Sequence, residues 1–483
     1  MTSHRTVVLV GPSGAGKTEL VAALTGGPPR LRGPLSWSTV HHAGTTLHLL
    51  DAPGDPFLAG PLLAGLHAAD LVLFVLSAGA DARTVQLWER CEGRPRVVAV
   101  TGLDRLGADF DEAVALCQRL LGEQVHPLSL PLHGDGPDEA VEGLLDLLSQ
   151  RLYDSSGGRR VERDPDPQHL PLIESLRSEL VEAVLAEAAD ESLLDAYLDD
   201  DRVPAGIVAL LHAAVAAGAL QPVLPVSPRA GVGLVELLDV LAASAVFEPP
   251  LVSAADGSPV APLTGSPDGP YVAQALQVTA AGTLVRVLSG SQTLPSATTG
   301  QLCVDTWADA GPGATRSDSD LVVELWDVPE PQHPTALRET APDPAAHPTT
   351  LHPTVHPPDP LAELRARVRL DRTSRFSEHP QPVLWTLGPA HTAQLLDGLD
   401  LQVDAVQVDD GARTVVRIKV PHAFARTVLS DLVGRGGRVL RRDADEHGDE
   451  AVVAELPDRE LLTYAVALAT TSQATASFTR PGP

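Results

Sequence analysis

Eight consecutive residues near the start of the chain have the types and spacing to bind phosphate. They read Gly-Pro-Ser-Gly-Ala-Gly-Lys-Thr, the complete pattern G-x-x-x-x-G-K-[ST] of a phosphate-binding loop, or P-loop. In such a loop, backbone N–H groups converge on phosphate oxygens, the lysine reaches the β- and γ-phosphates, and the threonine hydroxyl ligates magnesium. A glycine-rich turn without a ligand would not explain why one of the chain's two lysines stands here. The predicted nucleotide-binding residues are therefore Gly11, Pro12, Ser13, Gly14, Ala15, Gly16, Lys17 and Thr18.

A second short motif could supply the other side of the same site. Asp51-Ala52-Pro53-Gly54 ends an apolar run. Its carboxylate suits magnesium, and a glycine can turn its N–H toward a γ-phosphate. Alone, the tetrapeptide indicates only a strand followed by a turn. Together with the P-loop it predicts a magnesium site held by Thr18 and Asp51.

Short apolar runs separated by helix-length segments would position these motifs. Continuous runs rich in Val and Leu are typical of strands buried on both faces of a parallel sheet. We therefore expect an α/β domain, with a helical insertion at about 160–220 where apolar residues recur near the helical period. The predicted strands are 6–10, 46–50, 70–76, 96–100 and 222–226.

Bulk properties narrow the class of protein. The 483 residues carry a formal net charge of −28, which disfavours unspecific binding to DNA or other nucleic acid through clustered Lys and Arg. No apolar stretch reaches the length of a membrane span, and no signal peptide is recognisable at the start, so we expect a cytoplasmic protein without a membrane partner. Cys91, Cys117 and Cys303 lie far apart in no metal-binding or redox spacing.

Several segments, in order along the chain, resemble elongation factor G. The segment 101–110, Thr-Gly-Leu-Asp-Arg-Leu-Gly-Ala-Asp-Phe, is similar to the family's base-recognition segment, which begins Asn-Lys-x-Asp. Asp104 stands where the family's Asp accepts hydrogen bonds from guanine N1 and N2. The segment 222–227, ending at Ser227, is similar to the last base-contacting loop. Further similar segments are 190–198, 282–290, 384–396 and 420–478.

This resemblance implies GTP or GDP with Mg²⁺ as ligands, and the ribosome, through its RNA and proteins, as partner. It adds Thr101, Asp104 and Ser227 to the nucleotide-binding residues. It also implies a domain order, which we combine with the composition of the chain. The expected units are a P-loop GTPase domain (1–248), a linker (249–270), a reduced β-barrel domain (271–328), a Pro/His-rich linker (329–360), a third-domain-like α+β unit (361–408) and a ferredoxin-like, fifth-domain-like α+β unit (409–483).

The sequence also departs from the family pattern. Thr101 and Gly102 replace the Asn and Lys that contact the base, so guanine affinity should be lower. The residues assigned to hydrolysis are Lys17, Gly54 and Asp55. Asp55 stands where the family usually has the His that positions the attacking water. Because a carboxylate beside the phosphates is electrostatically disfavoured, hydrolysis should be slow. The interval from Thr18 to Asp51 is also shorter than in the family.

No room remains between the third and fifth units for the family's fourth domain. We therefore expect a truncated relative with weak or factor-dependent GTP hydrolysis that does not perform translocation. One alternative is a pseudo-GTPase that binds nucleotide without hydrolysing it. Another is a P-loop ATPase or kinase unrelated to translation.

Overall fold

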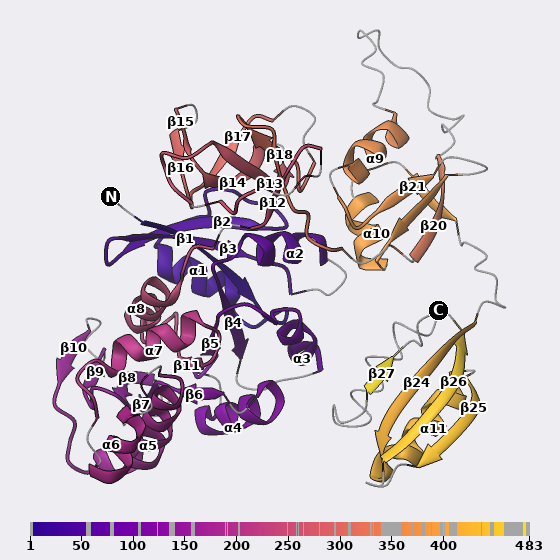
Figure 1. The fold of residues 1–483 in the computed structure, drawn as a ribbon. Helices are drawn as coiled ribbons and strands as arrows, with labels where there is room; N and C mark the ends of the chain where they lie inside the picture. Colours follow the sequence, from indigo (N-terminus) through magenta and orange to yellow (C-terminus); the bar gives the residue numbers. More distant parts are fainter. Residues whose placement is uncertain are drawn as a thin grey trace, which may run out of the picture.

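The computed structural model divides the chain into several sheets with associated helices (Figure 1). Among the described helices, none is both long and apolar enough to cross a bilayer. The residues it describes are 3–54, 59–77, 82–104, 108–122, 124–134, 141–155, 160–188, 190, 192–200, 203–248, 250–256, 258, 260–263, 265–279, 281–293, 296–307, 311–328, 331, 333–339, 359–369, 371–377, 382–387, 389–396, 399, 401–404, 413–435, 437–444, 449–457 and 477–479.

The N-terminal unit is built on a seven-stranded sheet in the order β2-β3-β1-β4-β5-β11-β6. Only β2 runs antiparallel to its neighbour, and the other pairs are parallel. All five predicted strands are present. The bounds are β1 (Ser3–Val10), β2 (Ser36–His42), β3 (Thr45–Asp51), β4 (Leu71–Ser77), β5 (Arg96–Thr101), β6 (Val125–Pro127) and β11 (Gln221–Pro225).

Helices cover both faces of this sheet, which explains its continuous apolar strands. In β1, Val7 and Leu9 pack in one apolar cluster with residues of α1 and α8, while Val8 and Val10 pack in another with residues of α2 and α4. Alternate side chains of a strand point to opposite faces, so both faces must be apolar. The bounds are α1 (Lys17–Thr25), α2 (Ala59–Ala68), α3 (Ala82–Glu89), α4 (Phe110–Leu121) and α8 (Leu234–Ser244).

An insertion between α4 and β11 carries the predicted helices and a sheet that we did not predict. The helices are α5 (Leu170–Ala186), α6 (Ser192–Asp200) and α7 (Ile207–Ala216). The antiparallel sheet has the order β10-β9-β8-β7. Its strands are short and contain Pro131 and Gly143, which weaken a strand pattern in sequence. They are β7 (Ser129–His133), β8 (Val141–Asp146), β9 (Leu152–Asp154) and β10 (Val161–Arg163).

The middle of the chain forms small antiparallel sheets, in the orders β17-β14-β13-β18, β15-β16 and β12-β19. β12 lies in the segment expected to be a linker, where it pairs with β19. The bounds are β12 (Val252–Ala254), β13 (Val272–Thr279), β14 (Gly282–Ser289), β15 (Ser291–Thr293), β16 (Ser296–Thr298), β17 (Leu302–Asp305), β18 (Thr315–Ser317) and β19 (Leu321–Val323).

The next unit has a four-stranded sheet in the order β21-β22-β20-β23. β20 lies in the segment 329–360 that we expected to be a linker, so that expectation is wrong for the residues of this strand. The strand is ordered by pairing with β22 and β23, which follow much later in the sequence. The bounds are β20 (His333–Glu339), α9 (Pro360–Arg369), β21 (Arg375–Ser377), β22 (Val383–Thr386), α10 (Pro389–Leu396) and β23 (Leu401–Asp404).

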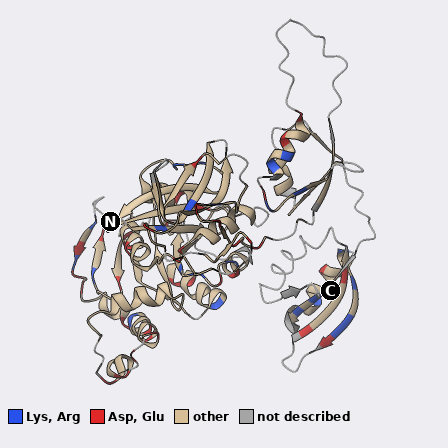
Figure 2. Ribbon diagram, turned by 45° about the horizontal axis from the view of Figure 1, so that its top comes forward, with Lys and Arg blue, Asp and Glu red and all other residues tan. Residues whose placement is uncertain are grey.

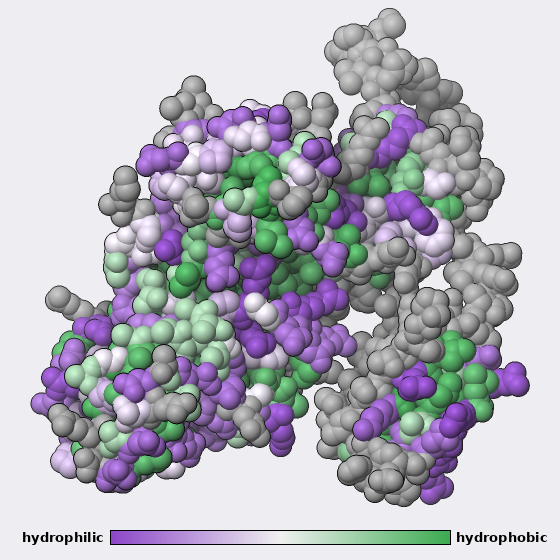
Figure 3. All heavy atoms as spheres, viewed as in Figure 1, coloured by the Kyte–Doolittle hydropathy of each residue, from purple (hydrophilic) through white to green (hydrophobic). Residues whose placement is uncertain are grey.

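The last sheet has the order β25-β26-β24-β27, with α11 packed in its apolar cluster. Basic residues mark its strands in Figure 2, and apolar surface is visible on this unit in Figure 3. Residues 458–476 of the expected ferredoxin-like unit lie outside the described residues. The bounds are β24 (Arg413–Pro421), α11 (His422–Gly434), β25 (Arg438–Ala444), β26 (Asp449–Pro457) and β27 (Ser477–Thr479).

Buried polar contacts join the β13–β14 hairpin to the N-terminal unit. Arg286 on β14 lies 2.5 Å from the Asp70 carboxylate, and both side chains are almost fully buried. The same carboxylate accepts a hydrogen bond from the Thr6 N–H at 2.7 Å. Gln277 on β13 accepts from the Leu35 N–H at 2.7 Å and donates to the Leu35 carbonyl at 3.0 Å. Such paired contacts leave little freedom for one unit to slide on the other.

Candidate functional site

The P-loop connects the end of β1 to the first turn of α1. Gly11 has a φ of 155°, and a Cβ at this position would lie 1.9 Å from the Val75 carbonyl oxygen, so only glycine fits. Gly16 caps α1 in the left-handed region, at a φ of 83°. The loop therefore leads directly into a helix N-terminus, where free N–H groups and the helix dipole favour an anion.

Lys17 lies inside this loop with its side chain folded over the backbone. Its Nζ donates to the Gly11 carbonyl at 2.7 Å and to the Pro12 carbonyl at 3.0 Å, and the residue is 7% exposed. Burial lowers the pKa of Lys17, and the nearby Asp51 carboxylate opposes that shift. A phosphate beside the ammonium would favour its charged form.

Thr18 and Asp51, the predicted magnesium ligands, are in direct contact. The Thr18 hydroxyl donates to Asp51 Oδ2 at 2.6 Å. Parallel pairing of β3 with β1 brings Asp51 beside Leu9, next to the start of the P-loop. Burial raises the pKa of Asp51, while the Thr18 hydrogen bond and Lys17 lower it. A hydroxyl and a carboxylate fit Mg²⁺, which takes few protein ligands and completes its shell with water and phosphate oxygens.

Gly54 brings the second motif against the first. A Cβ on Gly54 would lie 2.5 Å from the Ser13 nitrogen and 2.6 Å from the Gly11 carbonyl oxygen. This close backbone approach explains why glycine stands at the end of the Asp51–Gly54 turn. Asp55, the third residue assigned to hydrolysis, lies outside the described residues.

Thr101 supports the P-loop from the end of β5. Its hydroxyl donates to the Ala15 carbonyl at 2.7 Å and lies 3.3 Å from the Leu76 carbonyl oxygen, and the residue is 4% exposed. The structure therefore places this side chain on the backbone of the loop. Gly102 follows with a φ of 71°, a conformation that most side chains disfavour.

The remaining base-site residues, Asp104 and Ser227, lie on two loops joined by an arginine. Arg229 Nη1 lies 3.5 Å from Asp104 Oδ2, and Arg229 Nε lies 3.1 Å from Glu19 Oε1 on α1. Ser227 is buried, its backbone pairs with Val232, and its hydroxyl accepts from the Ala230 N–H at 3.4 Å. Our sequence reasoning missed Arg229. Its position in the sequence, two residues after the predicted base-contacting Ser227, could have indicated it.

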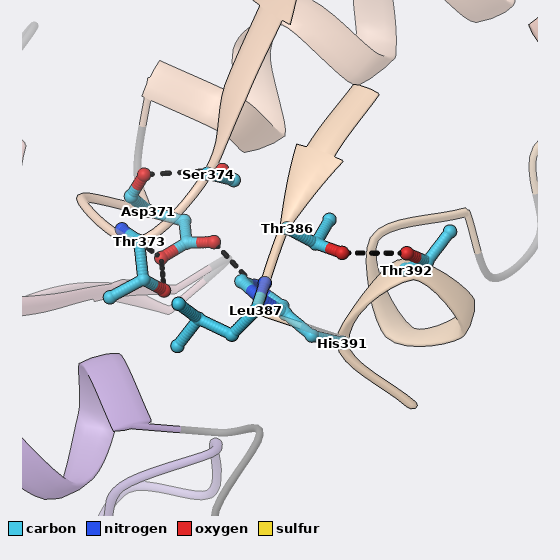
Figure 4. A network of polar contacts seen from close by, with 7 residues as sticks. All are labelled: Asp371, Thr373, Ser374, Thr386, Leu387, His391 and Thr392. Carbon is cyan, nitrogen blue, oxygen red and sulfur yellow. Dashed lines mark hydrogen bonds and ion pairs between the residues drawn. The ribbon is translucent and has the colours of Figure 1, made fainter. Parts of the chain in front are cut away.

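A second polar cluster, also missed from the sequence, joins the loop after α9 to α10 (Figure 4). His391 Nε2 and Asp371 Oδ2 are 2.6 Å apart, and His391 Nδ1 accepts from the Leu387 N–H at 3.3 Å. Burial pushes the pKa of Asp371 up, but hydrogen bonds from His391 and Thr373 outweigh it, and the pKa falls below its usual value. Because both imidazole nitrogens are engaged within the fold, the cluster orders this unit and offers no free base.

The cluster also borders the N-terminal unit. A Cβ on Gly60, at the start of α2, would lie 3.2 Å from Thr373 Oγ1. Asp371 and His391 help line a cavity of about 260 Å³ that also includes Pro61 and Trp326. The start of α2, which is the next described element after the Asp51–Gly54 turn, thus contacts the third unit.

Three arginines of the C-terminal unit pair with acidic residues. Arg435 contacts Asp431 at 3.0 Å, and Arg441 contacts Asp443 at 2.7 Å. Arg442 donates to both oxygens of Glu450. These acidic partners reduce the positive field around the three arginines.

Comparison with known proteins places this geometry in a family. Residues 414–481 match the family model for the elongation factor G C-terminus. A Mycobacterium tuberculosis protein named elongation factor G-like protein is 31% identical over 534 aligned positions, covering 93% of this chain and 71% of that protein. Elongation factor G of Mycoplasma pneumoniae is 28% identical over 52% of this chain and 38% of its own length.

A solved structure of a protein from Thermus thermophilus has the same fold. It superposes with a TM-score of 0.70 at 20% identity, covering 100% of this chain and 96% of that chain. The alignment over 93% of the chain and the match at 414–481 support the resemblance found in the sequence. The chain belongs to the elongation factor G-like protein family.

Proposed function

We propose that this chain is a GTP-binding protein that acts at the ribosome, hydrolyses GTP slowly or only with a ribosomal factor, and does not perform translocation. One observation carries the proposal: Lys17 lies within a P-loop beside a Thr18–Asp51 pair at 2.6 Å. An ammonium, a helix N-terminus and a magnesium-type ligand pair together suit the phosphates of a nucleotide.

Each residue has a role in this proposal. Lys17 binds the β- and γ-phosphates, and Gly54 offers its backbone N–H to the γ-phosphate. Thr18 and Asp51 would hold Mg²⁺, which neutralises charge on the phosphates when bound. The Thr101 hydroxyl fixes the P-loop backbone through Ala15.

Guanine preference is proposed from Asp104. A carboxylate accepts two hydrogen bonds from guanine N1–H and N2–H, whereas adenine presents an acceptor at N1. Because Thr101 bonds the P-loop and Gly102 has no side chain, affinity for the base should be modest. Losing one or two base contacts weakens binding by about one or two decades.

Slow hydrolysis is proposed from Asp55, which stands where the family places a histidine. A carboxylate there repels the γ-phosphate and cannot orient water as an imidazole does. Ribosome association and a cytoplasmic location are proposed from the C-terminal match at 414–481. Only residues 405–412 separate β23 from β24, which leaves no space for an intervening domain and argues against translocation.

The second candidate is a pseudo-GTPase that holds nucleotide and acts by occupying a partner's surface. The Thr101 contact with Ala15 favours it, because the site keeps its scaffold while one base-contacting position is used internally. Membership of the elongation factor G-like protein family argues against the third candidate, a P-loop ATPase or kinase unrelated to translation, and nucleotide competition tests this directly.

The test combines binding with turnover. We expect a fluorescent GTP analogue to bind the natural chain and to bind Lys17→Ala at least 100-fold more weakly, with ATP a poorer competitor than GTP. Phosphate release should be slow alone and faster with ribosomes. Equal binding by Lys17→Ala would refute the site, a preference for ATP would refute the guanine assignment, and no release in either condition would establish the pseudo-GTPase.

A further inference from the structure

Arg229 spans the space between two acidic residues beside the nucleotide site. Its Nε lies 3.1 Å from Glu19, the residue that follows the magnesium-ligand Thr18 along α1. Its Nη1 lies 3.5 Å from Asp104, the carboxylate proposed to read the base. The arginine side chain is 75% exposed, so the fold does not need it for packing.

The other residues of the base site offer few groups to hold a purine. Gly102 has no side chain to cover the ring. Pro228, between Ser227 and Arg229, has no backbone N–H to donate. The Thr101 hydroxyl is bonded to the P-loop. Asp104 alone would then bind the edge of the base, and Arg229 is in ion-pair contact with it.

We propose that Arg229 is the residue that holds the nucleobase, with its guanidinium plane stacked on the purine and anchored by Glu19. This inference rests on the proposed nucleotide-binding function. A guanidinium is planar and weakly hydrated, so it stacks well on aromatic faces, whereas an ammonium is a compact point charge. The arginine thereby replaces the cover that Gly102 cannot provide.

The two ion pairs of Arg229 differ in a way that suits this exchange. The contact with Glu19 is shorter and remains as the anchor, while the 3.5 Å contact with Asp104 is the one that the base replaces. Breaking an exposed ion pair costs little, and stacking on a base contributes more. Asp104 is then free to accept the N–H groups of guanine.

The proposal separates affinity from discrimination. Every purine has a π face, so stacking on Arg229 should strengthen ATP and GTP binding alike. Discrimination between them should come from Asp104, which bonds only the guanine edge. The two residues should therefore give different patterns when substituted.

The experiment measures binding of fluorescent GTP and ATP analogues to five full-length proteins: the natural chain, Lys17→Ala, Arg229→Ala, Arg229→Lys and Arg163→Ala. Arg229→Ala should weaken both nucleotides by about 5- to 100-fold, with the GTP/ATP ratio unchanged. Arg229→Lys, which keeps the charge and loses the plane, should lose most of the same affinity. Arg163→Ala removes another largely exposed arginine, which pairs with Asp154 in the insertion, and should change the binding of neither nucleotide.

Three outcomes would overturn the proposal. GTP binding that is unchanged or tighter in Arg229→Ala would show that the arginine only shields Asp104. Full affinity in Arg229→Lys would show that charge alone matters. If the natural chain binds neither nucleotide, the proposed function and this inference fail together, whereas loss of binding in Lys17→Ala alone would leave the function intact and refute only the role of Arg229.

Discussion

Substituting Arg286 by methionine should destabilise the N-terminal unit strongly. The Arg286 and Asp70 side chains are 2% and 0% exposed and lie 2.5 Å apart, so the substitution leaves a carboxylate without its cation inside the protein. Breaking a buried pair on one side costs about 3–5 kcal/mol. The Thr6 N–H still donates to Asp70, so we expect about 3 kcal/mol less free energy of unfolding.

Urea-induced unfolding, followed by tryptophan fluorescence and by circular dichroism, measures this loss. Arg163→Met removes an arginine that is 58% exposed from its pair with Asp154; it is the matched control and should cost less than about 1 kcal/mol. Combining Arg286→Met with Asp70→Asn should recover part of the loss, because the remaining group is neutral and still accepts from Thr6. A loss in Arg286→Met as small as in the control would refute the reasoning.

Three further predictions concern the site and its support. Gly54→Ala should weaken GTP binding at least 10-fold in a fluorescence titration, because its Cβ would meet the Ser13 nitrogen at 2.5 Å; unchanged affinity would contradict this. Asp104→Asn should shift preference from GTP toward XTP, whose C2 carbonyl accepts from an amide, and a retained GTP preference in competition assays would contradict it. Burial, and then His4, lowers the pKa of His48 to about 3, so the unfolded chain takes up a proton that the folded chain refuses, and stability falls as pH drops below 6.5. At pH 5 the part of the loss that comes from His48 should be about 2 kcal/mol in urea unfolding, and His48→Gln should remove that part. The part from His67, whose pKa burial lowers to about 4, should remain; a total loss in His48→Gln equal to that of the natural chain would refute the assignment.

The sequence predicted those parts that depend on local pattern. The P-loop and the strand before it are short, continuous signals, and the structure has them where the sequence indicated. β20 could not be found in this way, because Pro334 and the surrounding proline and histidine argue against a strand. Its order comes from β22 and β23, which lie far away in sequence.

The sequence suggested individual residues of the candidate site, but it did not predict the contacts between them. Nothing local reveals that Thr101 bonds Ala15 or that Arg229 contacts Glu19, since these pairs meet only after the sheet has assembled. The pair Asp371 and His391 is likewise formed by tertiary packing. Residue types indicate which chemistry is available, and topology decides which groups meet.

The Gln277 side-chain amide forms hydrogen bonds with both the N–H and the carbonyl of Leu35, as the backbone of a paired strand would. The connection from α1 to β2 is thus held at its last residue, Leu35, by a side chain from β13. If Leu35 moves, either the β13–β14 hairpin must move with it or the Gln277 side-chain amide must lose both of its hydrogen bonds. Lengthening this connection by added residues should accordingly be tolerated before Leu35 and resisted at it.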